Sequence, residues 1–427
     1  MRPTGTASIS VNGSVPNRAF GEAMMAGLTR TLEASGHLID SGLMAAIMDT
    51  VVLGGGEFEI AEFDIGRTND DPSRLVITVS APSAERLDAL VGELHRLGCF
   101  SAEAPGVTLK PAEKDGTAPP DFYSTTNATT LVRLDGDWVT VAQQRMDSVI
   151  VVEEGRPACR LLRDVKRGDR IVCGYEGVRV VPEFKARDRS EFSFMSSEIS
   201  SERKVELAVR DLARMMRAIV ERRGRIVVVA GPVVVHTGGA DDLAALIRGG
   251  YVHALLGGNA IAVHDVEHAL FRTSLGVDLT TGRPVDAGHR NHMAAINAVR
   301  AAGGLKQAVH SGLLKSGVMY ECVVNDVPFV LAGSLRDDGP LPETIMDLYG
   351  AQAAYARALE GADLALMLAS MLHAIAVGNM LPSSVTTVCV DINPAVVTKL
   401  NDRGSGQALG IVTDVGLFLN LLARELG

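Results

Sequence analysis

The segment from Val385 to Leu400 constrains the fold of this chain more than any other. Its β-branched run ends on Asp391, and Asn393 and Pro394 follow as typical N-cap and first-turn residues of a helix. This order predicts a buried parallel strand, an acid at its carboxyl end, and a helix. In doubly wound sheets such an acid commonly accepts hydrogen bonds from the ribose of a dinucleotide, although it also suits a helix cap or a pair with Lys399. We therefore expect a nicotinamide-type cofactor beside Asp391.

Composition narrows the class of protein. The 427 residues predict two or three domains, and the net charge of -10 without a run of Lys or Arg argues against nucleic acid as a partner. The five cysteines are widely spaced and form no C-x-x-C pair, which indicates neither a disulfide framework nor a thiolate zinc site. A reducing cytoplasm fits this pattern best.

Neither a leader nor a membrane span is expected. The N-terminal residues lack a basic segment followed by a continuous apolar one. The run Leu364–Val377 is the longest apolar candidate for a span, but its 14 residues include His373 and are too few to cross a bilayer. We interpret this run as a buried helix packed against a sheet.

The chain divides by pattern into an extension and three domains of α/β class. Residues 1–34 are predicted to be an extension, residues 35–115 a small α/β domain, and residues 121–200 a β-rich domain of short strands. A segment rich in Pro, Gly and charge separates the last two. In residues 201–427 helices and strands alternate, which predicts a doubly wound, Rossmann-like sheet.

The common phosphate-binding motifs are absent from the chain: neither G-x-G-x-x-G nor G-x-x-x-x-G-K-[ST] occurs. Two other turns are candidate phosphate cradles, Gly238–Gly239 before a predicted helix and a predicted tight turn at Gly378–Asn379. Asp241–Asp242 would repel a phosphate at the first, so the second is favoured. Both are equally consistent with ordinary turns and caps.

A third cluster consists of His264, Glu267 and His268, which have the H-x-x-E-H spacing of some zinc peptidases. Such a site requires a helix through these residues and a third ligand. Gly257–Gly258 followed by an apolar run indicates instead a strand that ends at His264, so no metal is expected. A metal-dependent hydrolase remains the alternative of a different class.

Two further polar segments are candidates for a site. His289 and His292 form one of them, beside the predicted sheet. Arg336, Asp337 and Asp338 follow another apolar strand. A guanidinium beside two carboxylates binds a zwitterion or a ribose, but the same residues also suit a salt-bridged surface loop.

Several long strings in the chain carry a resemblance to a known family. The sequence is similar to the lysine-oxoglutarate reductase/saccharopine dehydrogenase (LOR/SDH) conserved-region family, which includes archaeal-type NAD-dependent ornithine cyclodeaminases and the C-terminal part of cyanobacterial arginine dihydrolase. The match runs from about Ser35 to the C-terminus. The strings include FYSTTN, RMDSVIVVEE, GPVVVHTGG, GGYVHALLGGNAIAVHD, TSLGVDL, GHRNH, VPFVLAGSLRDDGPLP, MLHAIAVGNMLPSSV and VCVDINPAVVTKLNDRGS.

This resemblance implies an enzyme that uses and regenerates a bound NAD in each turnover. A hydride would leave the α-carbon of L-ornithine, the δ-amine would close a ring with loss of ammonia, and the cyclic imine would take the hydride back as L-proline. We also expect a cytoplasmic homo-oligomer. The cofactor contacts that the resemblance implies are Asn259, Ala260, Asp338, Gly378, Asn379, Met380, Leu381, Asp391, Asp414 and Val415.

The reaction needs further groups. A base near the α-amine is required, and the substrate's carboxylate and distal ammonium each need a partner of opposite charge. The candidates for the base are His264, Asp265, His289 and His292; for the carboxylate, Arg290 and Arg336; for the ammonium, Glu321 and Asp337.

One position departs from the family pattern. Relatives commonly have His-Pro after FYSTTN, where this chain has Ala128 and Thr129. An enzyme acting on another diamino acid or on a cyclic imine is therefore the near alternative. A non-catalytic NAD sensor whose small N-terminal α/β domain binds an amino acid is another alternative. Arginine dihydrolase activity is not expected, because no arginine-hydrolysing domain precedes the region.

Overall fold

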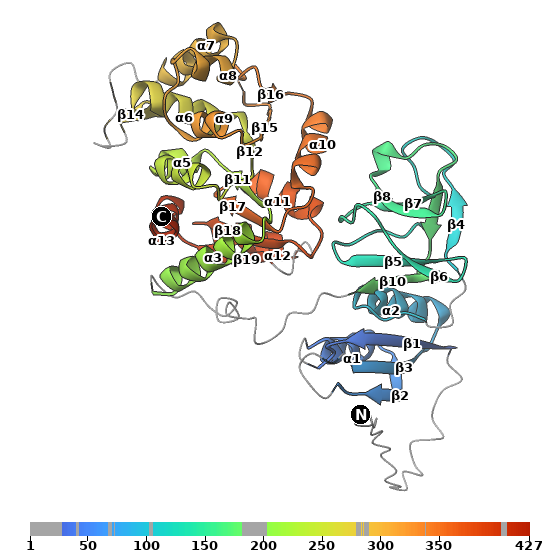
Figure 1. Ribbon diagram of the computed structural model, residues 1–427. Coiled ribbons are helices and arrows are strands. Elements are labelled where there is room, and N and C mark those ends of the chain that lie inside the picture. The colour runs from blue at the N-terminus through green and yellow to red at the C-terminus, as the bar shows by residue number, and fades with distance from the viewer. Residues whose placement is uncertain are drawn as a thin grey trace, which may run out of the picture. The chain divides into compact units, whose positions relative to one another are not determined.

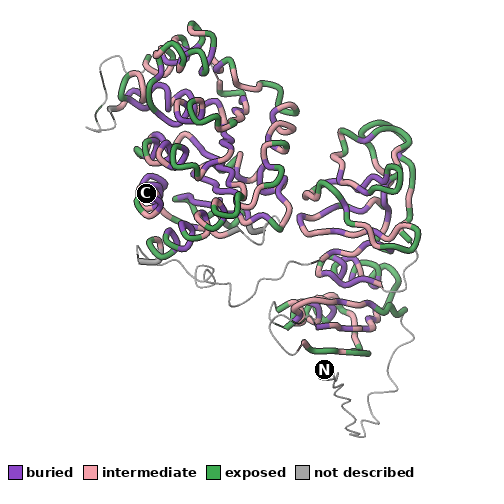
Figure 2. The backbone as a smooth tube through the Cα atoms, in the orientation of Figure 1, coloured by how far each residue is buried: buried purple, intermediate pink, exposed green. Residues whose placement is uncertain are grey.

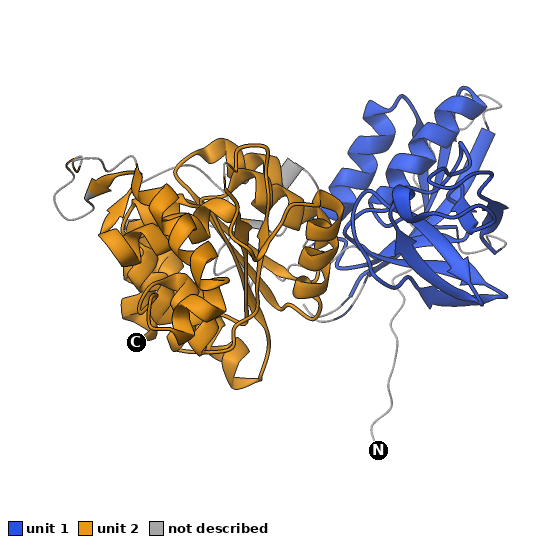
Figure 3. Cartoon of the chain, turned by 90° about the horizontal axis from the view of Figure 1, so that it is seen from above, with its two compact units in different colours: residues 1–190 blue, residues 191–427 orange. Residues whose placement is uncertain are grey.

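A computed structural model describes most of the chain, in two compact units that comprise residues 1–190 and residues 191–427 (Figure 3). Helices and strands are labelled in Figure 1. The described residues are 28–39, 42–66, 71, 73–101, 106–181, 203–278, 283, 285, 290–337, 339–402 and 408–427.

Unit 1 begins with a three-stranded antiparallel sheet in the order β1-β3-β2. Every second residue of β3 is buried, and these side chains pack against two helices on one face of the sheet. Strand β1 already pairs with β3 from Leu28, so the extension predicted up to residue 34 ends earlier than expected. The elements are β1 (Leu28–Gly36), α1 (Leu43–Leu53), β2 (Glu57–Asp64), β3 (Ser73–Ala81) and α2 (Ala84–Arg96).

The rest of unit 1 is β-rich, as predicted. Its strands form a three-stranded sheet in the order β10-β5-β6 and a four-stranded sheet in the order β4-β9-β7-β8. Alternating Val and Ile side chains from both sheets build the core. The elements are β4 (Thr108–Pro111), β5 (Thr129–Leu134), β6 (Asp137–Thr140), β7 (Val149–Glu153), β8 (Arg156–Arg160), η1 (Leu162–Asp164), β9 (Arg170–Cys173) and β10 (Val178–Val181).

Aromatic and cationic contacts join the two parts of unit 1. The guanidinium carbon of Arg179 lies 4.3 Å from the ring centroid of Phe100, and Arg179 Nη2 donates to Ser35 Oγ at 2.8 Å. The ring of His95 stacks on that of Tyr175, with centroids 5.5 Å apart. Burial lowers the pKa of His95 to about 4, so this imidazole is neutral between the two parts of unit 1.

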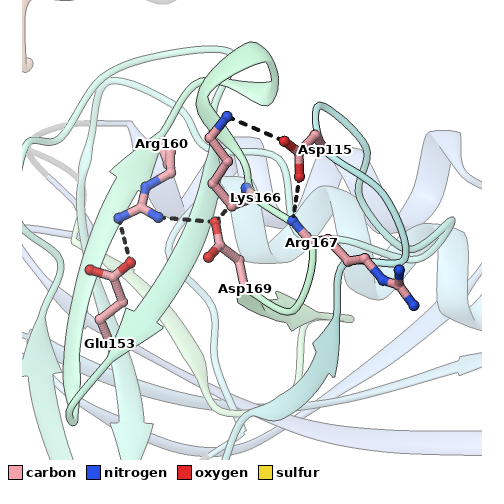
Figure 4. A network of polar contacts seen from close by, with 6 residues as sticks. All are labelled: Asp115, Glu153, Arg160, Lys166, Arg167 and Asp169. Carbon is pink, nitrogen blue, oxygen red and sulfur yellow. Dashed lines mark hydrogen bonds and ion pairs between the residues drawn. The ribbon is translucent and has the colours of Figure 1, made fainter.

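A polar network on the β-rich part ties three loops together (Figure 4). Arg160 contacts Glu153 at 2.8 Å and Asp169 at 3.0 Å, and the backbone N–H of Arg167 donates to Asp115 at 2.8 Å. Each carboxylate of the network has a cationic or N–H partner. Glu153, Lys166 and Asp115 are exposed, whereas the side chains of Arg160 and Asp169 are only 26% and 14% exposed. We therefore assign the network to the shape of these loops, and expect only the exposed pairs to have little effect on stability. Its members are Asp115, Glu153, Arg160, Lys166, Arg167 and Asp169.

Unit 2 contains a seven-stranded sheet in the order β16-β15-β12-β11-β17-β18-β19, and every neighbouring pair is parallel. The strand order reverses between β11 and β17, which confirms the predicted doubly wound sheet. The strands are β11 (Ile226–Ala230), β12 (Ala254–Gly258), β15 (Phe329–Ala332), β16 (Thr344–Ile345), β17 (Leu364–Leu368), β18 (Thr386–Asp391) and β19 (Ala408–Val412). A separate hairpin consists of β13 (Thr273–Ser274) and β14 (Val277–Asp278).

Helices cover both faces of this sheet (Figures 1 and 2). Along β11, Val228 packs in the core on one face, whereas Val227 and Val229 pack in the core on the other. The helices of the first face are α3 (Arg203–Glu221), α4 (Val233–His236), α5 (Ala240–Arg248), α6 (Asn259–Phe271), α7 (Asn291–Ala302), α8 (Leu305–His310), α9 (Val318–Val324) and α13 (Val415–Leu426). Those of the second face are α10 (Leu348–Leu359), α11 (Met371–Met380) and α12 (Pro394–Asp402).

The run Leu364–Val377 is not the single buried helix that we predicted. Its first five residues form β17 at the centre of the sheet, and α11 begins only at Met371. A continuous apolar run is equally consistent with a central parallel strand, because both of its faces are buried. Among the described residues, no helix combines the length and apolarity that crossing a membrane requires.

The predicted strand ending at His264 is also wrong. Strand β12 stops at Gly258, and α6 begins at the next residue and continues past His264 to Phe271. The two glycines therefore mark the end of a strand and not its interior. All five cysteines are buried and free of disulfides.

Candidate cofactor and substrate site

The polar residues of unit 2 gather at the carboxyl edge of its sheet, where the strand order reverses. Gly231 directly follows β11, and its N–H donates to Leu368 O of β17 at 2.9 Å. A Cβ at Gly231 would lie 2.1 Å from Ala369 O, so no other residue fits this approach of two backbones. In this fold class the crevice at such a reversal is the ordinary ligand position.

His373 borders this edge and was not predicted as a site residue. It lies in the first turn of α11, where its Nδ1 is 3.0 Å from Ser370 Oγ. A Cβ at Gly258 would lie 3.0 Å from His373 Cε1, so a side chain there would require the imidazole to shift. Burial lowers the pKa of His373, while the charge of Asp337 opposes that change. The sequence signal that could have identified His373 is a histidine in the first turn of a helix that follows an apolar strand.

Asn259 anchors the loop after β15 to the same edge. Its side chain is buried, and Oδ1 accepts hydrogen bonds from Leu341 N at 3.0 Å and Thr344 Oγ1 at 2.9 Å. Its Nδ2 donates to Asp337 Oδ1 at 3.3 Å. Because these bonds occupy the side chain, we expect a ligand to contact Asn259 through its backbone, at the start of α6.

The structure describes two of the three residues that we predicted to bind a zwitterion. Asp337 is half-buried, and its Oδ2 accepts a hydrogen bond from Ser334 N at 2.6 Å. Arg336 is exposed on the same loop, with its N–H bonded to Ser334 Oγ at 3.2 Å. Asp338 lies outside the described residues. The structure thus places Asp337 next to Asn259 at the carboxyl edge and leaves the guanidinium of Arg336 in solvent.

Asp391 lies where the sequence predicted, at the carboxyl end of β18. It is 9% exposed, and Oδ1 accepts a hydrogen bond from Asn393 N at 2.8 Å. Its second carboxylate oxygen takes no hydrogen bond from the residues that the structure describes. Asp414 caps α13 through a bond from Leu417 N at 2.9 Å, and Val415 is buried as the first residue of that helix.

The segment Gly378–Leu381 does not form the tight turn that we predicted. Gly378, Asn379 and Met380 are the last residues of α11, and Leu381 is its C-cap. A helix C-terminus carries the negative end of the dipole and repels phosphate. Gly238–Gly239 directly precede α5, but the first turn of that helix carries Asp241 and Asp242, which would repel a phosphate. The role of residues 378–381 as cofactor contacts stays a prediction.

A buried hydrogen-bond network surrounds Glu267, which has no exposed surface. Oε2 lies 2.9 Å from His264 Nδ1 and accepts from Leu275 N at 3.2 Å. Oε1 accepts from Thr273 Oγ1 at 2.9 Å and from Gly276 N at 3.0 Å. Burial alone would raise the pKa of Glu267, but the bonds from His264, Gly276 and Thr273 outweigh it and hold the pKa below its usual value.

A second imidazole packs against this network. The ring of His236, at the end of α4, makes an edge contact with that of His264, with centroids 4.7 Å apart. His236 Nδ1 lies 2.6 Å from Ser274 Oγ. Burial, with the charge of His264, lowers the pKa of His236 to about 4, so this ring is neutral. We call His236, His264, Glu267, Thr273 and Ser274 the imidazole cluster.

This arrangement leaves little capacity for a metal. The helix that the H-x-x-E-H spacing requires is present, with His264, Glu267 and His268 all on α6. However, both oxygens of Glu267 already accept hydrogen bonds. Within the described part of the chain, no group of three His, Cys, Asp or Glu side chains is arranged to hold a metal ion.

Other predicted residues lie apart from the carboxyl edge or outside the description. Asp265 is fully buried, and its oxygens accept from Val318 N and Met319 N, each at 2.8 Å, at the start of α9. Glu321 is buried and pairs with Arg248 at 2.6 Å. His289 is outside the described residues; Arg290 is exposed before α7, and His292 is half-buried in its first turn.

Asp265 is expected to make the protein less stable as the pH rises. Burial raises the pKa of Asp265 to about 7, against the two N–H bonds from α9, so the folded chain retains a proton between about pH 4 and 7 that the unfolded chain loses. The contribution of this group to the free energy of unfolding therefore falls across that window. The amide of Asp265→Asn does not titrate. The free energy of unfolding of this variant should therefore rise relative to that of the wild type by up to ~1.4 kcal/mol for each pH unit in this window. Urea unfolding of both proteins at several pH values measures this gain; a constant difference would contradict it.

Three family models match the chain. Residues 29–128 match the LOR/SDH bifunctional enzyme conserved region. Residues 129–209 match the first C-terminal region of arginine dihydrolase ArgZ-like proteins, and residues 210–422 match their C-terminal Rossmann fold.

Characterised relatives match over nearly the whole of this chain. The ornithine cyclodeaminase of Methanopyrus kandleri is 52% identical over 92% of this chain and 96% of its own length. The bifunctional arginine dihydrolase/ornithine cyclodeaminase ArgZ of Synechocystis sp. is 50% identical over 93% of this chain, which spans 58% of that enzyme. A solved ternary complex of AgrE with ornithine and NAD+ has 48% identity and a TM-score of 0.52, over 93% of this chain and 57% of that one. The chain therefore belongs to the LOR/SDH and ArgZ-like family that includes the archaeal ornithine cyclodeaminases.

Proposed function

We propose that this protein is an NAD-dependent ornithine cyclodeaminase that converts L-ornithine to L-proline and ammonia. The observation that carries the proposal is the 52% identity to the Methanopyrus enzyme over 96% of the length of that enzyme. The AgrE complex, which holds ornithine and NAD+ together, supports the same substrate and cofactor. A small amino acid is accordingly the proposed substrate.

We expect NAD to bind at the carboxyl edge of unit 2, where glycines and polar side chains lie together. Gly231 and Gly258 keep side chains out of the edge beside the strand reversal, as the close approach of a dinucleotide requires. Asp391 offers a ribose a carboxylate oxygen that takes no hydrogen bond from the described residues. When bound, NAD supplies an acceptor and donor for the hydride of the substrate α-carbon. The remaining proposed contacts are Asn259, Ala260, Asp338, Gly378, Asn379, Met380, Leu381, Asp414 and Val415.

His264 is the residue that we propose as the base for the substrate α-ammonium. The contact at 2.9 Å with the ionised Glu267 places the ring proton on Nδ1, which leaves the lone pair on Nε2 free to take a proton. This is the arrangement by which a carboxylate orients a catalytic imidazole. Asp265 is disfavoured for this role because backbone N–H groups of α9 occupy both of its oxygens.

The charged ends of the substrate need partners as well. Asp337 is the proposed partner of the distal ammonium, since it lies at the carboxyl edge and Asn259 fixes its orientation. Arg336, on the same exposed loop, is the proposed partner of the carboxylate. His289 and His292 remain candidates for proton transfer from the segment before and within α7.

The cellular location and the oligomeric state of the enzyme are also proposals. A cytoplasmic location is supported by five buried cysteines that form no disulfide. A homo-oligomer is supported by large apolar side chains exposed around the carboxyl edge, because monomers rarely expose such groups together. They include Leu335, Leu348, Leu372 and Ile392.

The purified protein should contain or bind NAD and convert L-ornithine to equal amounts of ammonia and proline. Treatment with a chelator should leave this turnover unchanged, because the described residues offer no metal site. Denaturing the protein, assaying the released NAD, and following both products with and without the chelator measures these outcomes.

Other outcomes would select the alternatives. Net accumulation of NADH with ornithine would indicate a dehydrogenase, and NAD without turnover would move the substrate to another diamino acid or a cyclic imine, with Ala128 as the first residue to test. Stoichiometric zinc that is lost in His264→Ala would favour a hydrolase.

A further inference from the structure

The loop between β6 and β7 holds a strained backbone. Gln143 and Asp147, near its two ends, have φ angles of 54° and 58°, in the left-handed region that side chains other than glycine rarely adopt. Such strain persists where surrounding bonds over-determine it, and it concentrates at ligand sites. This loop was part of a family string in the sequence, and the proposed chemistry of unit 2 does not use it.

The FYSTTN segment holds the loop in place. Thr125 Oγ1 donates to Arg145 O at 2.7 Å and accepts from Ser148 N at 3.0 Å. Gln144 Nε2 donates to Thr126 O at 2.5 Å, which fixes the orientation of the amide. Thr125 and Ser148 are each only 2% exposed. The two segments therefore form one polar unit that we call the FYSTTN loop pair, residues 122–127 and 143–148.

Gln144 and Arg145 of this loop pair each have a polar atom without a hydrogen-bond partner. Arg145 Nε and Gln144 Oε1 are both buried, and neither has a hydrogen bond within the described structure. Burial, together with the charge of the nearby Arg163, lowers the pKa of Arg145, while the charges of Asp164 and Asp147 partly oppose that change. Arg160, in the same part of unit 1, instead contacts two carboxylates directly. A buried donor or acceptor without a hydrogen-bond partner costs stability unless a ligand supplies one.

We propose that Arg145 and Gln144 form a receptor for the carboxylate and ammonium of an α-amino acid. The guanidinium supplies donors in the geometry that suits a carboxylate, and Gln144 Oε1 is an acceptor for an ammonium. Both groups belong to consecutive residues of one loop, which Thr125 and Thr126 hold in place. Identification of the ligand as ornithine rests on the proposed function; the receptor itself rests on the loop alone.

The test uses the full-length protein with Arg145→Met, and with Arg156→Met as the matched control, since Arg156 is an exposed arginine of β8 in the same unit. Binding of L-ornithine, of L-proline and of 1,4-diaminobutane, which lacks the carboxylate, is measured by calorimetry. Arg145→Met should bind one or both amino acids about 30-fold more weakly, as expected for loss of a charge-assisted bond. Its weak binding of the diamine should not change, and the control should match the wild type. Wild-type affinity of Arg145→Met for both amino acids would overturn the proposal.

Thermal unfolding without ligand separates this role from a structural one. Because Arg145→Met removes a buried donor that has no hydrogen-bond partner among the described residues, it should unfold at the same temperature as the wild type or at a higher one. A marked decrease would make Arg145 a structural residue and would overturn the proposal. Arg145→Lys retains the charge without the fork geometry and should recover only part of the affinity.

Kinetics distinguish the two sources of the amino acid. If the receptor holds the substrate, Arg145 takes the carboxylate role proposed for Arg336, and Arg145→Met raises KM for ornithine while the NAD content stays unchanged. If it holds a separate effector, KM stays unchanged while the affinity for proline falls. Should the wild type make no proline from ornithine, the proposed function fails, whereas the binding and unfolding experiments still decide the receptor.

Discussion

Asp391→Ala is expected to weaken NAD binding by about 100-fold, the loss that follows from removing a carboxylate bonded to a ribose. Asp391 ends β18 at the carboxyl edge, and one of its oxygens is free of hydrogen bonds from the described residues. The affinity is measured by calorimetry on protein from which NAD has been removed. Turnover at low NAD should fall in parallel and recover at saturating NAD, because Asp391 does not contact the reacting carbon in the proposed arrangement.

Asp363→Ala is the matched control for this variant. Asp363 lies at the opposite, amino edge of the same sheet, where Oδ2 accepts a hydrogen bond from Arg225 N at 2.7 Å. Its loss should lower stability and leave the affinity for NAD unchanged. If both variants bind NAD as the wild type does, Asp391 is only a turn residue that accepts the N–H of Asn393, and the ribose role is wrong.

Glu267→Gln is expected to lower kcat by about 100- to 1000-fold, because His264 would lose the carboxylate that sets its tautomer. The free energy of unfolding should also fall, by about 3 kcal/mol, since an amide NH2 must face at least one of the four donors that now surround Glu267. Steady-state kinetics across pH and urea unfolding measure the two effects separately.

A second variant distinguishes catalysis from stability. Asp211→Asn alters another buried acid of unit 2, which pairs with Arg214 on α3 and makes no contact with the imidazole cluster. It should lower stability without lowering kcat. If Glu267→Gln keeps the wild-type kcat and pH profile at a temperature where it is folded, His264 is not the base, and the cluster serves the fold alone.

The strand, acid and helix around Asp391 were predictable because each signal is local. A β-branched run favours a buried strand, and Asn393 followed by Pro394 is typical of a helix start. The alternation of such units then predicted a doubly wound sheet, since right-handed crossovers leave few other topologies. The resemblance to a known family supplied the cofactor and substrate independently of these signals.

The remaining features depend on contacts between distant residues. Leu364–Leu368 is a strand because it lies between β11 and β18, which its own apolar sequence does not reveal. The position of His264 on a helix followed from the stop of β12 at Gly258, which we had read as the interior of a longer strand. The bond between His236 and Ser274 joins residues 38 apart, and no local pattern predicts such a pair. The same holds for the unpartnered atoms of Gln144 and Arg145, which only the folded loop pair buries.

The buried cysteine thiols can report the unfolding of each unit through their reactivity. Cys99, Cys159 and Cys173 lie in unit 1, whereas Cys322 and Cys389 lie in unit 2. Burial raises the pKa of Cys99 and of Cys389 to about 12, so neither thiol reacts at neutral pH until the structure around it opens. Alkylation followed by peptide mass spectrometry therefore times the unfolding of each unit separately within one native chain, without any engineered label.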